Sequence, residues 1–489
     1  MAALAVVAHE VARRFGVIPL FLLEDHLYLA VSNPMDLQAQ DFIRQLTRKT
    51  IEPVLATRAD IEDALSRHYL GKERSAQAMG AIASRKPEGL VELPESTVRL
   101  EDEDAPVIKL VNYMLSQAVH LGASDIHLEP FSQKASLRYR VDGILHEFPP
   151  PPLHLFRSLV SRIKIISNLD ISERRLPQDG RTTVRVNERD YDLRVSIIPN
   201  MHGEGVVIRI LDPSRMGQDL EDLGFDADLL ERYERLIHKP YEILLVVGPT
   251  GSGKTTTLYA TLKKIYTPRR KLITLEDPVE FQLDGVTQIQ VNPDIGFTFA
   301  QGLRSILRHD PDVVMLGEIR DLESAEIALR ASLTGHLLFS TMHTNDAPLA
   351  VTRLVDMGIQ AFLVLSSLLG VLAQRLVRRL CGECKTRTHP TPSELQALGI
   401  SALPAGTTLF KPVGCAACGN LGYKGRVGIY EFLEITPEMR RLGSDDLKAP
   451  LLRDLAAPQG YRTLRDAALE KLYKGITSAE EVVGVTMRD

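Results

Sequence analysis

The chain has 489 residues, of which 44% are hydrophobic and 25% charged, a composition typical of globular proteins. It exceeds the length at which a single hydrophobic core stops growing, so we expect roughly three or four domains. The formal net charge is -5 and no basic block occurs, which argues against nucleic acid as the main partner.

We expect neither a signal peptide nor a membrane-spanning helix. Residues 1–7 are apolar, but charged residues follow at once and no small-residue cleavage site stands behind a long apolar core. The longest apolar stretch, residues 359–373, is interrupted by polar side chains and is shorter than the roughly 20 residues that span a bilayer. We interpret it as a buried helix.

The first 70 residues alternate short strand and helix patterns. They predict, in order, a hairpin, a helix and a strand over residues 20–31, 37–46 and 51–55. The hairpin is expected to turn at Glu24 and Asp25. Thr57 and Asp60 form a capping pattern that starts a second helix. We therefore predict a small α+β domain over residues 1–70.

Residues 71–104 differ from the segments on either side. They contain few large apolar side chains, are rich in alanine, serine, proline and glutamate, and end in a run of acidic residues. This composition predicts a mobile linker.

Residues 105–215 predict a second, sheet-rich α+β domain. Strand patterns occupy residues 135–140, 182–186, 191–197 and 205–210, and helix patterns occupy residues 107–121 and 153–166. Arg194 and Arg209 stand in two of these strands between apolar neighbours, where a guanidinium without an anionic partner would be costly. Asp192 or Asp212 would be an ordinary partner, and a bound anion is the alternative.

After Gly224 the pattern becomes strand, glycine-rich loop and helix, which is typical of a parallel sheet covered on both faces. A buried strand pattern at residues 242–247 leads through the sequence Gly-Pro-Thr-Gly-Ser-Gly-Lys-Thr into a helix pattern at residues 256–266. This is the P-loop motif in the context that it requires. The residues predicted to bind nucleotide here are Gly248, Pro249, Thr250, Gly251, Ser252, Gly253, Lys254, Thr255 and Thr256.

The P-loop predicts how ATP and Mg²⁺ are bound. Its glycines let successive backbone N–H groups surround phosphate oxygens, and the positive end of the following helix adds to the attraction. Lys254 is expected to reach the β- and γ-phosphates, and Thr255 to ligate the magnesium ion.

Acidic residues at strand ends predict the catalytic groups. Asp312 and the four apolar residues that follow it form a strand pattern, expected beside the P-loop strand. This pattern leads to Glu318, our candidate for polarising the attacking water. Many P-loop enzymes carry a magnesium-binding aspartate just before this glutamate, but position 317 is glycine. A second strand pattern ends in Glu276 and Asp277, which would face the same crevice at the carboxyl edge of the sheet.

Three further residues are candidates for contacting the γ-phosphate, His343 as a sensor and two arginines as sources of positive charge. A strand pattern at residues 337–341 leads to His343, which would lie at the same sheet edge. Arg304 and Arg308 are four residues apart, so we expect them on one helical face just before the 312–316 strand. Solvation at the surface is the alternative for both arginines.

The four cysteines form two pairs, Cys381 with Cys384 and Cys415 with Cys418. Each pair is C-x₂-C, and two such pairs supply the four thiolates of a tetrahedral Zn²⁺ site. With no further ligand nearby, the site is expected to be closed and structural. Cysteines used in this way are typical of a reducing compartment, which predicts the cytoplasm.

These segments together resemble the secretion ATPases that power type II secretion, type IV pilus assembly and related machines. Four signatures of that family match residues 248–255, 273–280, 303–321 and 334–347. Four segments of the domain that precedes its core match residues 123–130, 140–143, 174–181 and 192–196.

The resemblance implies an α/β fold with a RecA-like P-loop ATPase core at residues 216–380, preceded by a PAS-like domain. It also implies a tetracysteine zinc-binding subdomain at residues 381–427 and a C-terminal helical subdomain at residues 428–489. Further implications are a homohexamer, magnesium dependence, and docking of residues 1–70 on an inner-membrane platform protein from the cytoplasmic side. Glycine at position 317 is normal for this family. Arg194 and Arg209 would swing onto bound nucleotide as the subunit closes.

Type II secretion and pilus assembly remain as two alternatives within the resemblance. Pilus-assembly motors often carry repeated Arg-Leu-Gly motifs that bind a cyclic dinucleotide, whereas residues 13–16 hold one imperfect match. We therefore favour type II secretion.

Two other classes of protein are less consistent with the sequence. A nucleic-acid translocating motor needs a basic channel with stacking aromatics, but the chain has no tryptophan and only 6% aromatic residues. A non-hydrolysing switch or scaffold has no use for carboxylates aimed at the γ-phosphate, such as Glu318 and Glu276.

Overall fold

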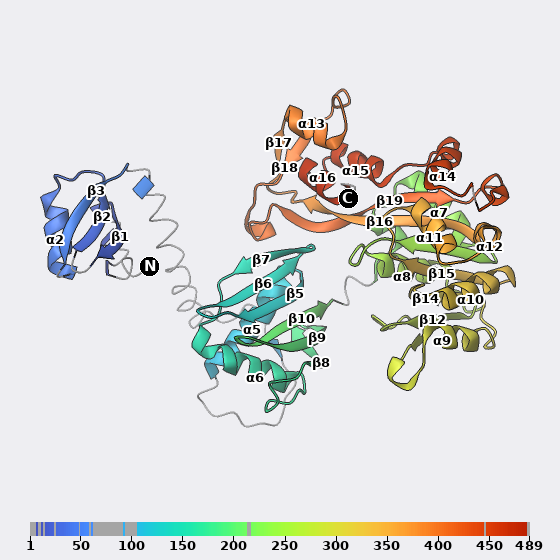
Figure 1. Ribbon diagram of the computed structural model, residues 1–489, viewed down its shortest axis with the longest axis horizontal. Helices are drawn as coiled ribbons and strands as arrows, with labels where there is room; N and C mark the ends of the chain where they lie inside the picture. The colour runs from blue at the N-terminus through green and yellow to red at the C-terminus, as the bar shows by residue number, and fades with distance from the viewer. Residues whose placement is uncertain are drawn as a thin grey trace.

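The computed structural model describes residues 6–7, 11–12, 15–23, 26–47, 49–57, 60–61, 91–92, 105–212, 217–444 and 446–486 (Figure 1). Their strands form one three-stranded sheet, two seven-stranded sheets and one two-stranded sheet. Every helix in these ranges is too short or too polar to cross a lipid bilayer.

The first sheet confirms the hairpin, helix and strand expected near the N-terminus. It consists of β1 (Val17–Leu23), β2 (His26–Val31) and β3 (Thr50–Leu55), with helix α2 (Leu37–Thr47). The strand β2 pairs antiparallel with β1 and parallel with β3. The Thr57 hydroxyl accepts from the backbone N–H of Asp60 at 3.2 Å, which confirms the predicted cap. The expected turn residues Glu24 and Asp25 lie outside the described residues.

The segment 71–104, expected to be a linker, is described only at Val91–Glu92. These two residues form β4, which pairs antiparallel with β8 (Gln178–Val186) of the second sheet. Part of the expected linker therefore contributes a short edge strand, which needs only two residues with free backbone groups and no apolar pattern.

The second sheet is antiparallel, in the order β4-β8-β9-β10-β5-β6-β7. Its other strands are β5 (Ala123–Pro130), β6 (Ala135–Val141), β7 (Ile144–Phe148), β9 (Arg189–Asn200) and β10 (Gly203–Leu211). Alternate residues such as Ile126 and Leu128 pack against helices α5 (Ala105–His120) and α6 (Phe156–Ile166). One face of the sheet is therefore the core, and the other carries polar side chains.

The third sheet has the order β13-β12-β14-β15-β11-β16-β19 and is parallel except for β19. The strands are β11 (Glu242–Val247), β12 (Leu272–Glu276), β13 (Thr287–Gln290), β14 (Val313–Leu316), β15 (Leu337–Met342), β16 (Leu368–Leu380) and β19 (Tyr423–Glu434).

Helices cover both faces of this third sheet. Leu244 and Val246 of β11 pack with helices α7 (Ala227–Ile237) and α8 (Lys254–Ile265). Ile243 and Leu245 face the other core, which holds α9 (Phe299–Ile306), α10 (Leu322–Leu333), α11 (Ala347–Asp356) and α12 (Ala361–Ser367). The strands are buried on both faces, as expected for a parallel sheet in an α/β fold.

Two expectations about this sheet were wrong. The strand β14 does not lie beside the P-loop strand β11, because β15 pairs with both of them. Residues 359–373 are not one buried helix, since α12 ends at Ser367 and β16 begins at Leu368. The hydroxyl of Ser367 bonds back to the carbonyl of Leu363 at 2.6 Å, and Leu368 then pairs in parallel with Ile243. An open edge of β11 thus favours a strand where the apolar run alone suggests a helix.

The C-terminal part of the chain packs along β16 and β19, and one of its helices also contacts α11. It contains β17 (Thr386–Thr388), α13 (Pro392–Leu398), β18 (Leu409–Lys411), α14 (Ala449–Ala456), α15 (Leu464–Tyr473) and α16 (Ala479–Thr486). Figure 1 shows β17, β18 and α13 together above the antiparallel pair of β16 and β19, next to α15 and α16.

Candidate functional site

The phosphate-binding loop joins β11 to α8 at the carboxyl edge of the third sheet. Gly248 has a φ of +153°, and a Cβ there would lie 2.5 Å from the backbone oxygen of Gln374. Gly253 has a φ of +88° and directly precedes the helix. Both positions therefore require glycine, because a side chain would collide or strain the backbone.

Lys254 lies folded over this loop. Its Nζ donates to the carbonyl of Gly248 at 2.8 Å and to that of Pro249 at 3.1 Å. Burial lowers the pKa of Lys254, and the nearby Glu318 carboxylate opposes that effect. Thr255, one residue further in the first turn of α8, is exposed. An ammonium group and an exposed threonine thus stand at the start of a helix, where phosphate and its counter-ion bind.

Glu318 lies beside the phosphate-binding loop at the neighbouring strand ends. It follows β14, and His343 follows the adjacent strand β15, so that Glu318 Oε2 and His343 Nε2 are 3.6 Å apart. Arg320 forms an ion pair with Glu318 and lies 3.9 Å from Asp277. Arg320 was not among the residues predicted from the sequence, although it stands only two residues after the glutamate.

Glu276 occupies a different position from the one expected. Its side chain is only 3% exposed, and it accepts hydrogen bonds from Tyr259, Thr274 and Gln288. Tyr259 belongs to α8, so the carboxylate is held against that helix by neutral donors. Asp277, the next residue, is the one that approaches Arg320.

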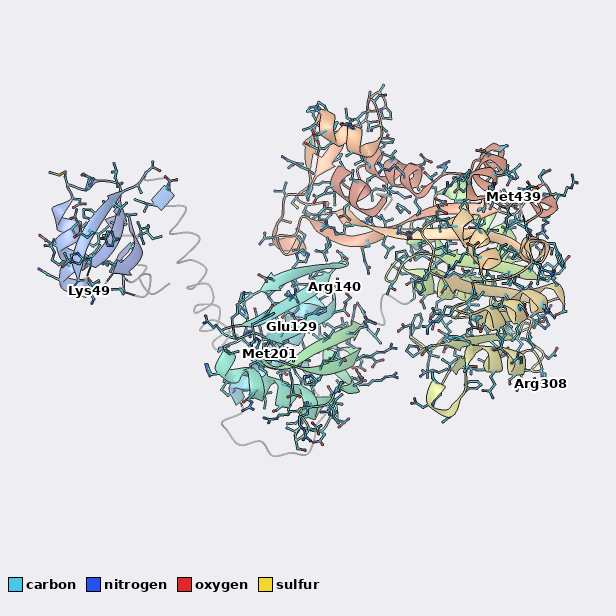
Figure 2. The ribbon with its side chains drawn as sticks, in the orientation of Figure 1. Lys49, Glu129, Arg140, Met201, Arg308 and Met439 are labelled. Carbon is cyan, nitrogen blue, oxygen red and sulfur yellow. The ribbon has the colours of Figure 1, made fainter. Side chains whose placement is uncertain are left out.

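Arg304 and Arg308 do not lie on one helical face, because α9 ends at Ile306. Arg304 pairs with Glu323 of α10. Arg308 donates to the carbonyl of Arg304 at 2.9 Å and lies at the outer edge of this part of the molecule (Figure 2). In this conformation their contacts connect the surface of α9 to α10.

The polar face of the second sheet carries a row of arginines. Arg181 of β8 is directly opposite Arg194 of β9, which is opposite Arg209 of β10. Directly opposed residues point to the same face, so the three guanidinium groups line one hollow together with Asp179 and Ser196. Arg181 was not predicted from the sequence as a site residue, since only strand register brings it into this row.

Two arginines of this row, Arg194 and Arg209, form ion pairs with carboxylates. Arg194 reaches across to the third sheet, where it lies 3.1 Å from Glu280 Oε2 and donates to the carbonyl of Val279 at 3.2 Å. Arg209 pairs with the buried Asp125 of β5 at 3.1 Å. Neither carboxylate was considered as a partner from the sequence.

The four cysteines converge as predicted. All four Sγ atoms lie within 4.8 Å of one another, with distances of 3.9 Å for Cys381 to Cys415 and 3.8 Å for Cys415 to Cys418. A tetrahedral Zn²⁺ with bonds of about 2.3 Å would space its thiolates by about 3.8 Å. Backbone N–H groups also point at the sulfurs, such as that of Gly422 at 3.2 Å from Cys418 Sγ. These residues fit a zinc ion.

Two parts of the chain match known protein families. Residues 100–484 match the model of the family "Type II/IV secretion system protein", and residues 1–75 match the MshEN domain. The chain belongs to the Type II/IV secretion system protein family. It is an ATPase with the α/β fold of the secretion ATPases.

Relatives of this secretion ATPase cover nearly its whole length. It is 45% identical to the type II secretion system ATPase E of Vibrio cholerae, over 94% of this chain and 91% of that protein. It is 42% identical to the type IV pilus assembly ATPase PilB of Myxococcus xanthus, over 99% of this chain and 86% of that protein.

Solved structures share the fold. The pilus retraction motor PilT with bound ADP is 26% identical, with a TM-score of 0.51, over 77% of this chain and 96% of that one. The ATPase DotB of Legionella pneumophila is 21% identical, with a TM-score of 0.57, over 80% of this chain and 97% of that one.

Proposed function

We propose that this secretion ATPase is the motor of a type II secretion system and drives assembly of the pseudopilus that exports proteins. The match to the Vibrio cholerae ATPase E over 94% of the chain is the observation that carries this proposal. The motor works as a homohexamer at the cytoplasmic face of the inner membrane. The MshEN match at residues 1–75 supports a docking role for the first domain, through which the platform protein is bound.

Type IV pilus assembly is the second candidate, favoured by the 42% identity to PilB of Myxococcus xanthus. Deleting the gene in its own host separates the two. If the chain is a type II secretion motor, the deletion strain should accumulate exoproteins in the periplasm and keep its surface pili. Restoring the wild-type gene must reverse the secretion defect. Loss of pili with normal exoprotein release would assign the chain to pilus assembly instead.

Within the proposed motor, each site residue has a role that follows from its chemistry. Glu318 polarises the attacking water, Lys254 binds the β- and γ-phosphates, and His343 reports the γ-phosphate to β15. When bound, Mg²⁺ neutralises charge on the phosphate oxygens, with Thr255 as its protein ligand. Glu276 supports the site from behind through its hydrogen bond to Tyr259 of α8.

The second domain supplies the remaining positive charge. Arg194 and Arg209 approach the γ-phosphate when that domain closes, since an arginine delivered to the transferring group stabilises its developing charge. Arg194 already contacts the loop that follows β12, which supports a short path to the nucleotide. Arg304 and Arg308 contact the nucleotide only after their present contacts with α10 and α9 are exchanged.

Phosphate release measured with and without DNA distinguishes the proposed secretion motor from a nucleic-acid translocating motor. Phosphate release by the full chain should be unchanged by added single- or double-stranded DNA, because the proposed substrate is a protein assembly. A severalfold DNA stimulation would favour a translocase.

A further inference from the structure

The strand β16 continues beyond the end of β11, still paired with β19, and lies against the phosphate-binding loop. Its register with β11 pairs Ala373 with Val247, the last residue of that strand. The next residues, Gln374 and Gly248, therefore stand side by side at the carboxyl edge. This agrees with the 2.5 Å that would separate a Cβ on Gly248 from the Gln374 backbone oxygen.

The side chain of Gln374 reaches into the loop. It is only 2% exposed, and its Nε2 donates to the carbonyl of Ser252 at 2.8 Å. Its Oε1 accepts from the hydroxyl of Thr257, in the first turns of α8, also at 2.8 Å. A Cβ on Gly253 would lie 2.8 Å from the same Nε2. The loop is thus fitted closely around one buried amide.

An amide suits this place because it carries a donor and an acceptor on one planar group. The donor holds the Ser252 carbonyl, and the acceptor fixes the orientation of the amide through Thr257. In a trans peptide the carbonyl and the following N–H point in opposite directions. Holding the Ser252 carbonyl toward β16 therefore turns the N–H of Gly253 away from β16, into the concave side of the loop.

We propose that Gln374 is a positioning residue for ATP hydrolysis, which aims the Gly253 N–H at the phosphates of the nucleotide. It acts through the Ser252–Gly253 peptide and does not touch the reacting atoms. The loop then meets the nucleotide already in the binding geometry, so no ordering of this peptide accompanies binding. This role goes beyond the P-loop motif, since residue 374 is supplied by a strand far along the chain.

The test measures nucleotide binding and turnover of the full chain carrying Gln374→Leu. Leucine fills the space of the amide but makes neither hydrogen bond. We expect the dissociation constant for a fluorescent ADP analogue to rise about tenfold or more, because a hydrogen bond to a charged phosphate becomes misaligned. KM for ATP should rise with it. Thr257→Val should cause a smaller loss of ADP affinity. The double variant should lose no more affinity than Gln374→Leu alone, because both changes break the same chain of hydrogen bonds.

Gln40→Leu is the matched control. Gln40 is also a buried glutamine, 6% exposed, and its Nε2 donates to the carbonyl of Pro34 at 2.8 Å within the first domain. Its loss should lower thermal stability without changing ADP affinity or KM. A similar result for Gln374→Leu, with parental ADP affinity, KM and kcat, would show that Gln374 has only a structural role and overturn the proposal.

A second variant decides the question if Gln374→Leu does not fold. Gln374→Glu keeps the size of the side chain and its acceptor for Thr257, but places a carboxylate oxygen against the Ser252 carbonyl. ADP affinity must then fall by at least the same factor. Unchanged affinity in a folded Gln374→Glu protein contradicts the proposal.

Discussion

At the scale of single residues, the nucleotide site is a balance of opposite charges. Glu318 lies between Arg320 and His343. Its negative charge also raises the pKa of Lys254, against the lowering caused by burial. The hydrogen bond to the Glu318 carboxylate raises the pKa of Arg320, so this guanidinium stays charged. A carboxylate held at this place can accept a proton from the attacking water.

Glu318→Gln and Lys254→Ala should both abolish hydrolysis but differ in nucleotide binding. Glutamine cannot accept the proton of the attacking water, so we expect turnover to fall by about a hundredfold or more while ATP affinity is kept. Alanine at position 254 removes the cation over the phosphates, so both ATP hydrolysis and ATP affinity should fall. Phosphate release and equilibrium ATP binding check this. Equal loss of binding in the two variants would contradict the division of roles.

Arg194→Ala and Arg209→Ala should each lower turnover far more than nucleotide affinity. An arginine that meets the γ-phosphate in the transition state accounts for about three to five orders of magnitude in rate. Arg185→Ala is the control, because Arg185 lies on the same sheet and pairs with Asp190 at its exposed surface. If either arginine variant hydrolyses ATP at the parental rate, that arginine belongs to the architecture of the sheet.

At the scale of elements, β16 connects the two sites of the molecule. It pairs with the P-loop strand at its start and leads directly into Cys381 at its end. Close to that end, Arg378 pairs with Glu481 at 2.6 Å, and its guanidinium lies 3.9 Å from the ring centre of Tyr423. The four cysteines therefore lie at the far end of β16, while Gln374 contacts the phosphate-binding loop.

Cys381→Ser should release zinc and destabilise residues 380–426 without changing nucleotide binding. A closed site of four thiolates contributes folding energy only to the segment that it joins. Metal analysis should show that zinc is lost, and hydrogen exchange should rise in that segment but not in α8. Full zinc occupancy in the variant would refute the ligand assignment.

At the scale of the whole molecule, the second sheet contacts both the ATPase core and the segment that follows the cysteine pairs. Arg194 contacts Glu280 and Val279 at one of them. At the other, Asp142 accepts from the backbone N–H of Gly425 at 2.8 Å, just after the cysteine pairs. Breaking and remaking the first contact while the second is kept would swing the arginine row toward the nucleotide.

Deleting residues 1–70 should leave ATP hydrolysis intact and remove membrane recruitment. The first sheet has a hydrophobic core of its own, and residues 1–75 match a separate domain. Basal phosphate release by the truncated protein should equal that of the full chain. Fractionation of host cells should find the truncated protein away from membranes. Continued co-fractionation with membranes would show that another part of the chain docks.

The sequence by itself determined the features that depend on local spacing. The P-loop lies between a strand and a helix, and each C-x₂-C pair places two thiols close together, because neighbouring residues fix these patterns. The strands β11, β14 and β15 were predicted for the same reason.

Only the tertiary structure decided which distant residues meet. It placed β15 between β11 and β14, turned the end of one apolar run into β16, and enclosed Glu276 among neutral donors. The row of Arg181, Arg194 and Arg209 and the amide of Gln374 follow from strand register. Register and strand order are set by the packing of the whole sheet, so no short stretch of the sequence contains them.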